Sequence, residues 1–442
     1  MKNIVFRYTA AAQLIILLMF AAVASAAPVE IDIYGPGQNL TYVALTDPVT
    51  DSGAQPSPYA ADLDKLVRHN LSFLPFLGFV DGKTIIGGNT PASYKSPGID
   101  FKRYLLAGTD LLIVAGWPKV DSGKDARVEM RVYETGQGSM MLGKAYYVSS
   151  KELLPAVADK FCSDFMKMLT GRGDFFLSTL AFISQSKNGQ KDVWSVRPTG
   201  RDLRQLTAVK GIALSPSWSP DGRYVIFSHI GERAHALGVW DRINNRTQLI
   251  RFPGNTVIGP SFLPDNTVAV SLAVNGNSDI FLLNHIFKKQ KTLEQSWGID
   301  VSPSLDASGK KMAFVSSRMG NPHVFLKDLE TNTLKRISRD GKYNTSPDIS
   351  PDGTLIVYSR RTDAGHRLFV HDLISGREKQ ITFGPGNDEM PSFAPDSYFV
   401  AFASNRSGKY KIYLTTRHGG APKMVDTGKH DASFPSWGRI NE

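Results

Sequence analysis

From residue 178 to the C-terminus, short apolar segments alternate with polar turns in a repeating pattern. The repeat is marked by a proline, a serine or aspartate, and then an apolar residue. The proline recurs at six positions 43 or 44 residues apart: Pro216, Pro260, Pro303, Pro347, Pro391 and Pro435. Self-similarity at a fixed period of this length indicates an array of equal structural units.

Each repeat contains four strand-like segments separated by turns rich in Gly, Asn and Asp. The proline motif is the first. An apolar strand comes second, at residues 224–228, 267–271, 311–316, 355–359 and 399–404. The third carries an aromatic residue, at 193–194, 239–240, 280–281, 324–325, 368–369 and 412–413. The fourth is short, at 204–207, 247–250, 291–294, 335–338, 379–382 and 422–425. Four strands in about 44 residues are typical of a β-propeller blade.

The repeat predicts a propeller of six blades over residues 178–442. The first set of strands, 179–207, has no preceding proline motif, and the last motif, 435–437, has no strands after it. We therefore expect the C-terminal strand to pair with the first set. This pairing would close the ring and remove an open sheet edge.

Residues 27–170 lack the repeat and predict a small α/β domain. Ser57 and Pro58 are a favoured helix start, and the helix is expected to run towards Phe73. Ser149 and Glu152 form a capping box that opens a second helix, ending near Leu169. Strands are expected at 111–115, 127–135 and 140–148. The fold class is thus a small N-terminal α/β domain followed by an all-β propeller.

The first 26 residues have the pattern of a cleaved signal peptide. Lys2 and Arg7 precede an apolar run at 14–23, and the small residues Ala24 and Ala26 follow it. The run is short for a membrane anchor, which needs roughly 18 or more apolar residues, and no other stretch approaches that length. We expect cleavage after Ala26 and a mature chain that does not span a membrane.

The single cysteine, Cys162, leaves the chain without an intramolecular disulfide. No cysteine lies near the cleavage site, so a lipid anchor there is not expected. These features favour a soluble envelope protein of a Gram-negative cell. The formal net charge of +10 falls to +8 without Lys2 and Arg7, and the basic residues are dispersed. They indicate a solvated basic surface or attraction to acidic partners, with no nucleic-acid site.

The residues that could carry chemistry favour structural roles. Asp221, Asp265, Asp352 and Asp396 recur once per repeat, as turn residues do, whereas catalysis needs one converged site. His366 and His371 are an odd number of residues apart on one strand and face opposite sides. Cys162 lies on the apolar side of a helix and predicts an inert thiol. No catalytic residue, metal site or cofactor is expected.

The chain resembles the TolB family. The resemblance rests on the export signal, the small α/β domain, the junction at 169–175, the six repeats and the ending at 434–437. It implies a periplasmic component of the Tol–Pal system that links inner-membrane Tol proteins to the lipoprotein Pal. It further implies roles in outer-membrane integrity, in constriction during division and in bacteriocin import.

The resemblance also implies two binding regions, while the chain itself is expected to be monomeric. Pal would dock at the propeller mouth, on loops just upstream of each proline motif: Thr256, Gly259, Val301, Asn344, Thr345, Asp388 and Glu389. TolA would bind a strand at the start of the mature chain, residues 27–35: Val29, Glu30, Ile31, Asp32 and Ile33. A loosely docked terminus remains the alternative for that segment. The alternative function is a periplasmic propeller enzyme or small-ligand sensor that uses the central channel.

Overall fold

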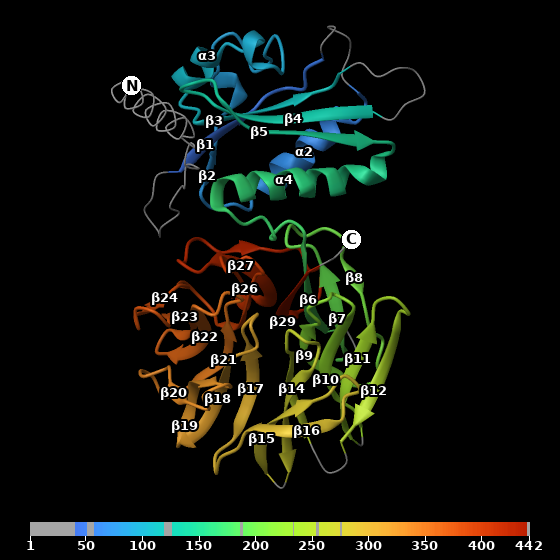
Figure 1. The fold of residues 1–442 in the computed structure, drawn as a ribbon, viewed down its shortest axis with the longest axis vertical. Helices are drawn as coiled ribbons and strands as arrows, with labels where there is room; N and C mark the ends of the chain where they lie inside the picture. The colour runs from blue at the N-terminus through green and yellow to red at the C-terminus, as the bar shows by residue number, and fades with distance from the viewer. Residues whose placement is uncertain are drawn as a thin grey trace, which may run out of the picture.

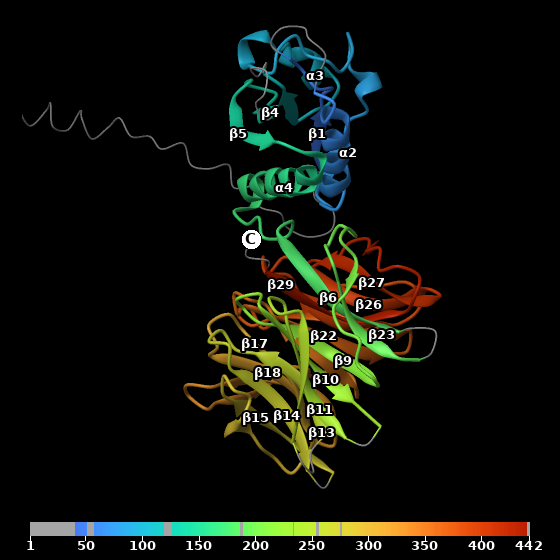
Figure 2. The same cartoon turned by 90° about the vertical axis from the view of Figure 1, so that its right-hand side faces the viewer.

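The computed structural model describes residues 40–50, 57–118, 126–185, 189–232, 234–252, 256–274 and 276–439 of the 442-residue chain. The described part forms two domains, and the smaller N-terminal one lies above the C-terminal one in Figure 1. Figure 2 shows the same stacking from the side, with α4 (Leu154–Thr170) between the N-terminal sheet and the larger domain and α2 (Ala60–Leu71) upright beside the sheet.

The N-terminal domain is a five-stranded sheet of order β2-β1-β3-β4-β5, with helices on both faces. Residues alternate between two cores along its strands, as the pleat requires. Val43 of β1 packs towards α2 and α4. Its neighbour Ala44 packs towards α3 and the loop before it. The strands and the remaining helices are β1 (Thr41–Leu45), β2 (Leu77–Phe79), η1 (Gly82–Thr84), η2 (Ser96–Gly98), α3 (Phe101–Leu106), β3 (Leu111–Gly116), β4 (Ala126–Glu134), β5 (Met140–Val148) and η3 (Lys151–Leu153).

Both long helices begin later than the sequence predicts. Ser57 accepts a hydrogen bond from the Tyr59 N–H at 3.3 Å, but this closes a separate turn before α2 starts at Ala60. The capping box predicted for α4 was wrong. The helix begins at Leu154, after the 3-10 turn η3, and no side chain caps it. Pro155 supplies the fixed φ of the first turn instead.

The C-terminal domain consists of β-strands in every described element. Its strands are β6 (Ser178–Gln185), β7 (Lys191–Val196), β8 (Arg204–Gln205), β9 (Ile212–Trp218), β10 (Tyr224–Ile230), β11 (His235–Asp241), β12 (Arg246–Arg251), β13 (Thr256–Phe262), β14 (Val268–Val274), β15 (Asn277–Leu283), β16 (Lys289–Glu294), β17 (Asp300–Leu305), β18 (Lys311–Met319), β19 (Asn321–Asp328), β20 (Leu334–Arg336), β21 (Asn344–Ile349), β22 (Leu355–Thr362), β23 (Gly365–Asp372), β24 (Glu378–Gln380), β25 (Asp388–Phe393), β26 (Phe399–Ser407), β27 (Lys409–Thr416), β28 (Lys423–Met424) and β29 (Ala432–Arg439).

The strands pair as antiparallel meanders set around a common centre, like the blades of a propeller (Figure 1). Four sheets contain four strands each: β13–β16, β17–β20, β21–β24 and β25–β28. An eight-stranded sheet holds β6–β12 and β29, and its two halves meet at one parallel bridge between Lys191 and Ile212. If the domain has six blades, as predicted, the eight-stranded sheet consists of two blades, and the bridge between Lys191 and Ile212 marks the boundary between them.

The last strand, β29, pairs antiparallel with the first strand of the domain, β6. The register runs from Ala432 opposite Ser184 to Arg439 opposite Ser178. Trp437 of β29 lies 5.9 Å from the ring of Phe175, at the junction between the domains. The chain thus brings residues more than 250 positions apart into one sheet.

Several contacts join the two domains. Asp159 of α4 is buried and forms an ion pair with Arg201, and the His69 ring lies 2.9 Å from the Thr199 carbonyl. The Lys423 ammonium donates to the carbonyl of Ser72 at 2.6 Å. Charged and polar groups therefore hold α2 and α4 against the C-terminal domain.

Candidate partner-binding site

The centre of the C-terminal domain is built by the proline motifs of six strands, β9, β13, β17, β21, β25 and β29. The residue before each proline has a positive φ of 48–56°. The ladder to the neighbouring strand shifts register at the same place in all six. Each motif is therefore a β-bulge, which bends the strand and leaves one residue unpaired. The positive-φ residues are Ser215, Gly259, Ser302, Ser346, Met390 and Phe434.

Residues of all six motifs line one cavity of about 150 Å³. Small-molecule sites usually have roughly 300–1,000 Å³. The cavity therefore does not favour the alternative of a sensor or enzyme that uses the central channel.

One carboxylate that lines the cavity joins adjacent sheets in this ring. Asp348 accepts hydrogen bonds at 2.6 Å from the Ser304 hydroxyl and from the Phe393 N–H, which lie on the two neighbouring sheets. Burial raises the pKa of Asp348 to about 6. The other five motifs carry serine at this position.

The seven mouth residues predicted from the sequence lie at or just upstream of these bulges, but they differ in accessibility. Gly259 lines the cavity with its backbone. Four are partly exposed: Thr256, Val301, Thr345 and Glu389. Glu389 accepts a hydrogen bond from the Tyr410 hydroxyl at 2.6 Å and lies 3.6 Å from His366 Nδ1.

Asn344 and Asp388 are fully buried, so neither side chain lies on the surface. Each binds an arginine of the neighbouring strand. Asp388 pairs with Arg406 at 2.7 Å, and Asn344 accepts from Arg360 at 2.9 Å. These two side chains therefore hold the base of the mouth loops, and the surface for a partner comes from other residues.

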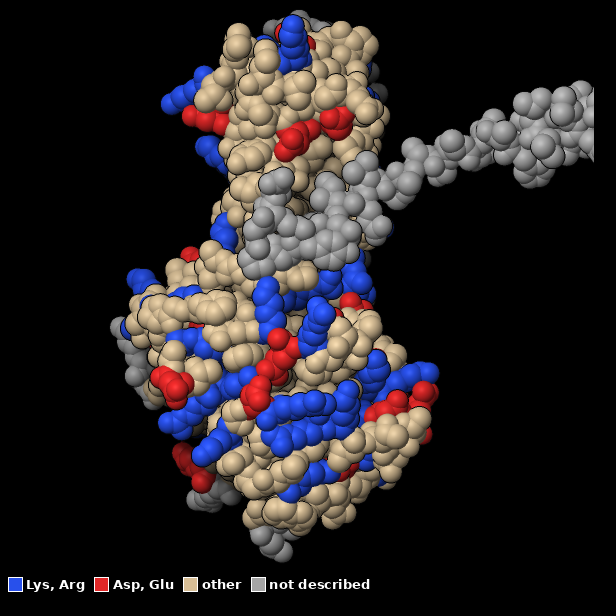
Figure 3. Space-filling model, turned by 90° about the vertical axis from the view of Figure 1, so that its left-hand side faces the viewer, with Lys and Arg blue, Asp and Glu red and all other residues tan. Residues whose placement is uncertain are grey.

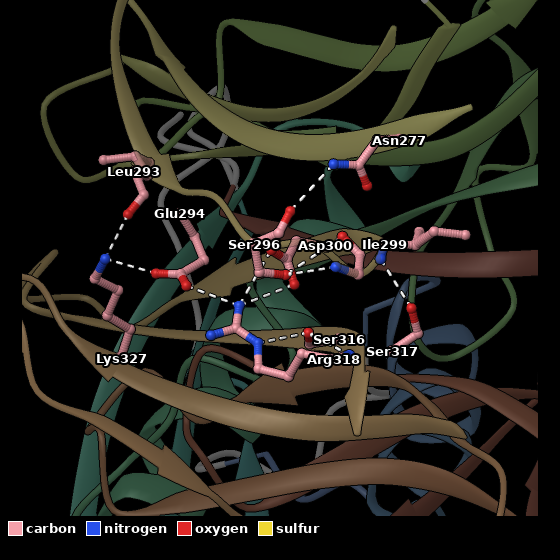
Figure 4. Close-up of polar contacts among 11 residues, drawn as sticks. Asn277, Leu293, Glu294, Ser296, Ile299, Asp300, Ser316, Ser317, Arg318 and Lys327 are labelled. Carbon is pink, nitrogen blue, oxygen red and sulfur yellow. Dashed lines mark hydrogen bonds and ion pairs between the residues drawn. The ribbon is translucent and has the colours of Figure 1, made fainter. Parts of the chain in front are cut away.

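In the sheet β17–β20, Asp300 occupies the position that Asn344 and Asp388 have in their sheets, three residues before the motif proline. Asp300 is also fully buried. Its partner Arg318 donates to Asp300 at 3.0 Å and to Glu294 at 2.7 Å (Figure 4). Lys327 donates to the second oxygen of Glu294 at 2.6 Å. Two cations and two carboxylates thus neutralise one another, as buried charges must.

This charged cluster clamps both ends of the loop between β16 and β17. Glu294 ends β16 and Asp300 begins β17, so Arg318 bridges the five-residue loop 295–299. Inside the loop, Asn277 donates to the Ser296 carbonyl at 3.1 Å, and the Ile299 N–H donates to the Ser317 hydroxyl at 2.8 Å (Figure 4). The loop is therefore fixed along its whole length.

Trp297, at the middle of this loop, has 76% of its surface exposed. Ile299 and Met319 nearby are 47% and 57% exposed. Sequence reasoning missed Trp297. A signal was present in the sequence, because Trp297 lies between two repeats. The other tryptophans of the C-terminal domain fall on repeat positions, and they are Trp194, Trp218, Trp240 and Trp437.

The four repeated aspartates lie in turns, and Cys162 is buried. Asp221, Asp265, Asp352 and Asp396 each accept a hydrogen bond from the N–H two residues further on. Burial raises the pKa of the Cys162 thiol well above its ordinary value. Among the described residues, no three His, Cys, Asp or Glu side chains are grouped as metal ligands would be. No described helix is long and apolar enough to cross a membrane.

The predicted TolA-binding residues, Val29, Glu30, Ile31, Asp32 and Ile33, lie outside the described residues, as do the predicted signal peptide and its cleavage site.

The fold and the mouth define a two-domain β-propeller protein with a small α/β domain before the propeller. A family model described as the TolB beta propeller domain matches residues 166–441. The chain is 56% identical over 307 residues to the Tol-Pal system protein TolB of Nitratidesulfovibrio vulgaris, covering 69% of each chain. It is 32% identical over 332 residues to the protein TolB homolog of Chlorobium luteolum, covering 74% of this chain and 73% of the relative.

The chain belongs to the TolB family. Its fold is also similar to the crystal structure of TolB from Acinetobacter baumannii, with a TM-score of 0.77 at 19% identity, covering 92% of this chain and 98% of that one. The predicted family and fold class are thereby confirmed.

Proposed function

We propose that this protein is a periplasmic binding scaffold of the Tol–Pal system. In this role it links inner-membrane Tol proteins to a Pal lipoprotein and supports outer-membrane integrity and constriction during division. Bacteriocins that cross the envelope would use the same protein. It acts by binding partners and catalyses no reaction. The observation that carries the proposal is membership of the TolB family over most of the chain.

Pal docks at the mouth of the propeller, where loops are held by a rigid scaffold. Loops positioned in this way commonly carry recognition. The four partly exposed residues Thr256, Val301, Thr345 and Glu389 supply side chains to this surface. TolA binds separately, through the strand at residues 27–35. A bridging protein needs two surfaces that can be occupied together.

The proposal is tested with the mature chain and the soluble domain of the Pal lipoprotein from the same organism. Thr256→Arg and Glu389→Arg should weaken binding at least tenfold. Thr256→Arg should leave the melting temperature unchanged, whereas Glu389→Arg also loses the hydrogen bond from Tyr410 and should lower it slightly. Ile374→Arg is the matched control, because Ile374 is 83% exposed on the turn between β23 and β24, away from the proline motifs. Deletion of residues 27–35 should abolish TolA binding and spare Pal binding. Equal Pal affinity in the mouth variants and the control would reject the assigned mouth.

A further inference from the structure

We infer that Trp297 is the anchor of the mouth, so that the partner's strongest contact lies over the sheet β17–β20. The inference rests on the proposed function and adds to it the residue that dominates binding and the chemistry of the surface that receives it. Among the described tryptophans, Trp297 is by far the most exposed. Large rigid aromatic side chains on a surface are typical binding hot spots.

The loop is rigid before any partner arrives. Arg318 holds carboxylates at both of its ends, and the Gly298 N–H donates to the Ser296 hydroxyl at 3.1 Å. The Ser317 N–H returns a hydrogen bond to the Ile299 carbonyl at 3.0 Å. Binding through a loop already in place avoids the entropy cost of ordering it.

The backbone places three residues that have exposed apolar side chains at the same end of β18. A Cβ on Gly298 would lie 2.6 Å from the backbone nitrogen of Arg318, so only glycine lets the loop approach β18 this closely. The residues on either side of it, Trp297 and Ile299, therefore lie beside the end of β18, which carries Met319. These three side chains are called the Trp297 patch below. A group of exposed apolar residues on a rigid frame indicates an interaction surface.

The surroundings of the Trp297 patch are basic. The Arg336 guanidinium lies 3.8 Å from the Met319 sulfur. Figure 3 shows Lys and Arg gathered over the face that carries β19, β20, β23 and β24. Exposed cations on β20, on the turn between β20 and β21 and at the end of β22 are Lys335, Arg339, Lys342 and Arg361. The fitting partner is a folded protein domain with an apolar pocket rimmed by Asp and Glu, and within the proposed function this domain is that of Pal.

The test measures binding of the soluble Pal domain to the mature chain and to Trp297→Ala. Loss of a hot-spot tryptophan should weaken binding by about 30-fold or more. Because the side chain is exposed, the melting temperature should not move. Ile374→Ala, at the 83% exposed Ile374, is the control and should bind like the wild type.

A spectroscopic readout separates contact from an indirect effect. Docking should shift the fluorescence of Trp297 to shorter wavelength, and Trp297→Phe should abolish the shift. Rising salt should slow association, because the cationic rim attracts an acidic partner. Equal affinities of wild type and Trp297→Ala, with no fluorescence shift, would overturn this inference alone. Failure of the wild type to bind Pal would contradict the proposed function itself, and the inference with it.

Discussion

Replacing Trp437 by alanine tests how much the packing of the last strand contributes to the free energy of unfolding. Trp437 is 9% exposed, packs on Phe175, and donates its indole N–H to the Ser392 carbonyl at 3.0 Å. Loss of a buried tryptophan costs about 3–5 kcal/mol through the lost contacts and the cavity left behind. The unpaired carbonyl adds about 1 kcal/mol. We expect the free energy of unfolding to fall by about 4–6 kcal/mol.

The assay is urea unfolding of the mature chain, followed by far-ultraviolet circular dichroism. Trp297→Ala is the matched control, since it removes the same side chain from a 76% exposed site and should cost less than about 0.5 kcal/mol. Trp218→Ala, at the equivalent motif position in β9, should resemble Trp437→Ala, because Trp218 is 6% exposed. If Trp437→Ala unfolds like the control, packing of the last strand at the ring closure does not stabilise the domain, and the reasoning about this buried contact fails.

Asp348, Arg201 and the N-terminus of the mature chain provide three further tests. Burial raises the pKa of Asp348 from 3.8 to about 6, so the folded state binds a proton here more tightly than the unfolded state does. Protonation of Asp348 therefore stabilises the fold fully below pH 4, and this stabilisation is lost as the pH rises through 6. In urea unfolding, the free energy of unfolding of the wild type should rise by about 1–3 kcal/mol relative to that of Asp348→Ser when the pH is lowered from 7 to 4.5. The same difference between the two proteins at both pH values would contradict this prediction. Arg201→Ala leaves the buried Asp159 unpaired and should cost about 3–5 kcal/mol. It should also expose the linker at 171–177 to limited proteolysis, and wild-type resistance would argue against charge-held docking. Mass spectrometry of the periplasmic form should give an N-terminus at Ala27, whereas an intact Met1 would exclude export by cleavage.

The repeat allowed the strands of the C-terminal domain to be predicted closely, because its period fixes every strand relative to a proline. The short outer strands are the exception. Residues 379–382 were expected as a strand, but β24 runs from Glu378 to Gln380. Outer strands pair on one side only, so their ends depend on a few hydrogen bonds that no apolar pattern marks.

The helix starts and the mouth residues show what the sequence could not provide. Ser149 and Glu152 match a capping box, yet the chain makes a 3-10 turn there and the helix begins at Leu154, with Pro155 in its first turn. Asn344 and Asp388 are polar residues beside a loop, a pattern that favours exposure. Their burial depends on arginines 16 and 18 positions away, and only the folded sheet brings these together.

The central claim is that a Pal lipoprotein binds this protein at the propeller mouth. A photo-crosslinking amino acid placed at Thr345, which is partly exposed just upstream of its proline motif, tests the claim directly in living cells. The same group at Ile374 serves as the control. Mass spectrometry of the crosslinked product should identify the Pal lipoprotein from Thr345 and not from Ile374. Crosslinking to Pal from Ile374 alone would contradict the account.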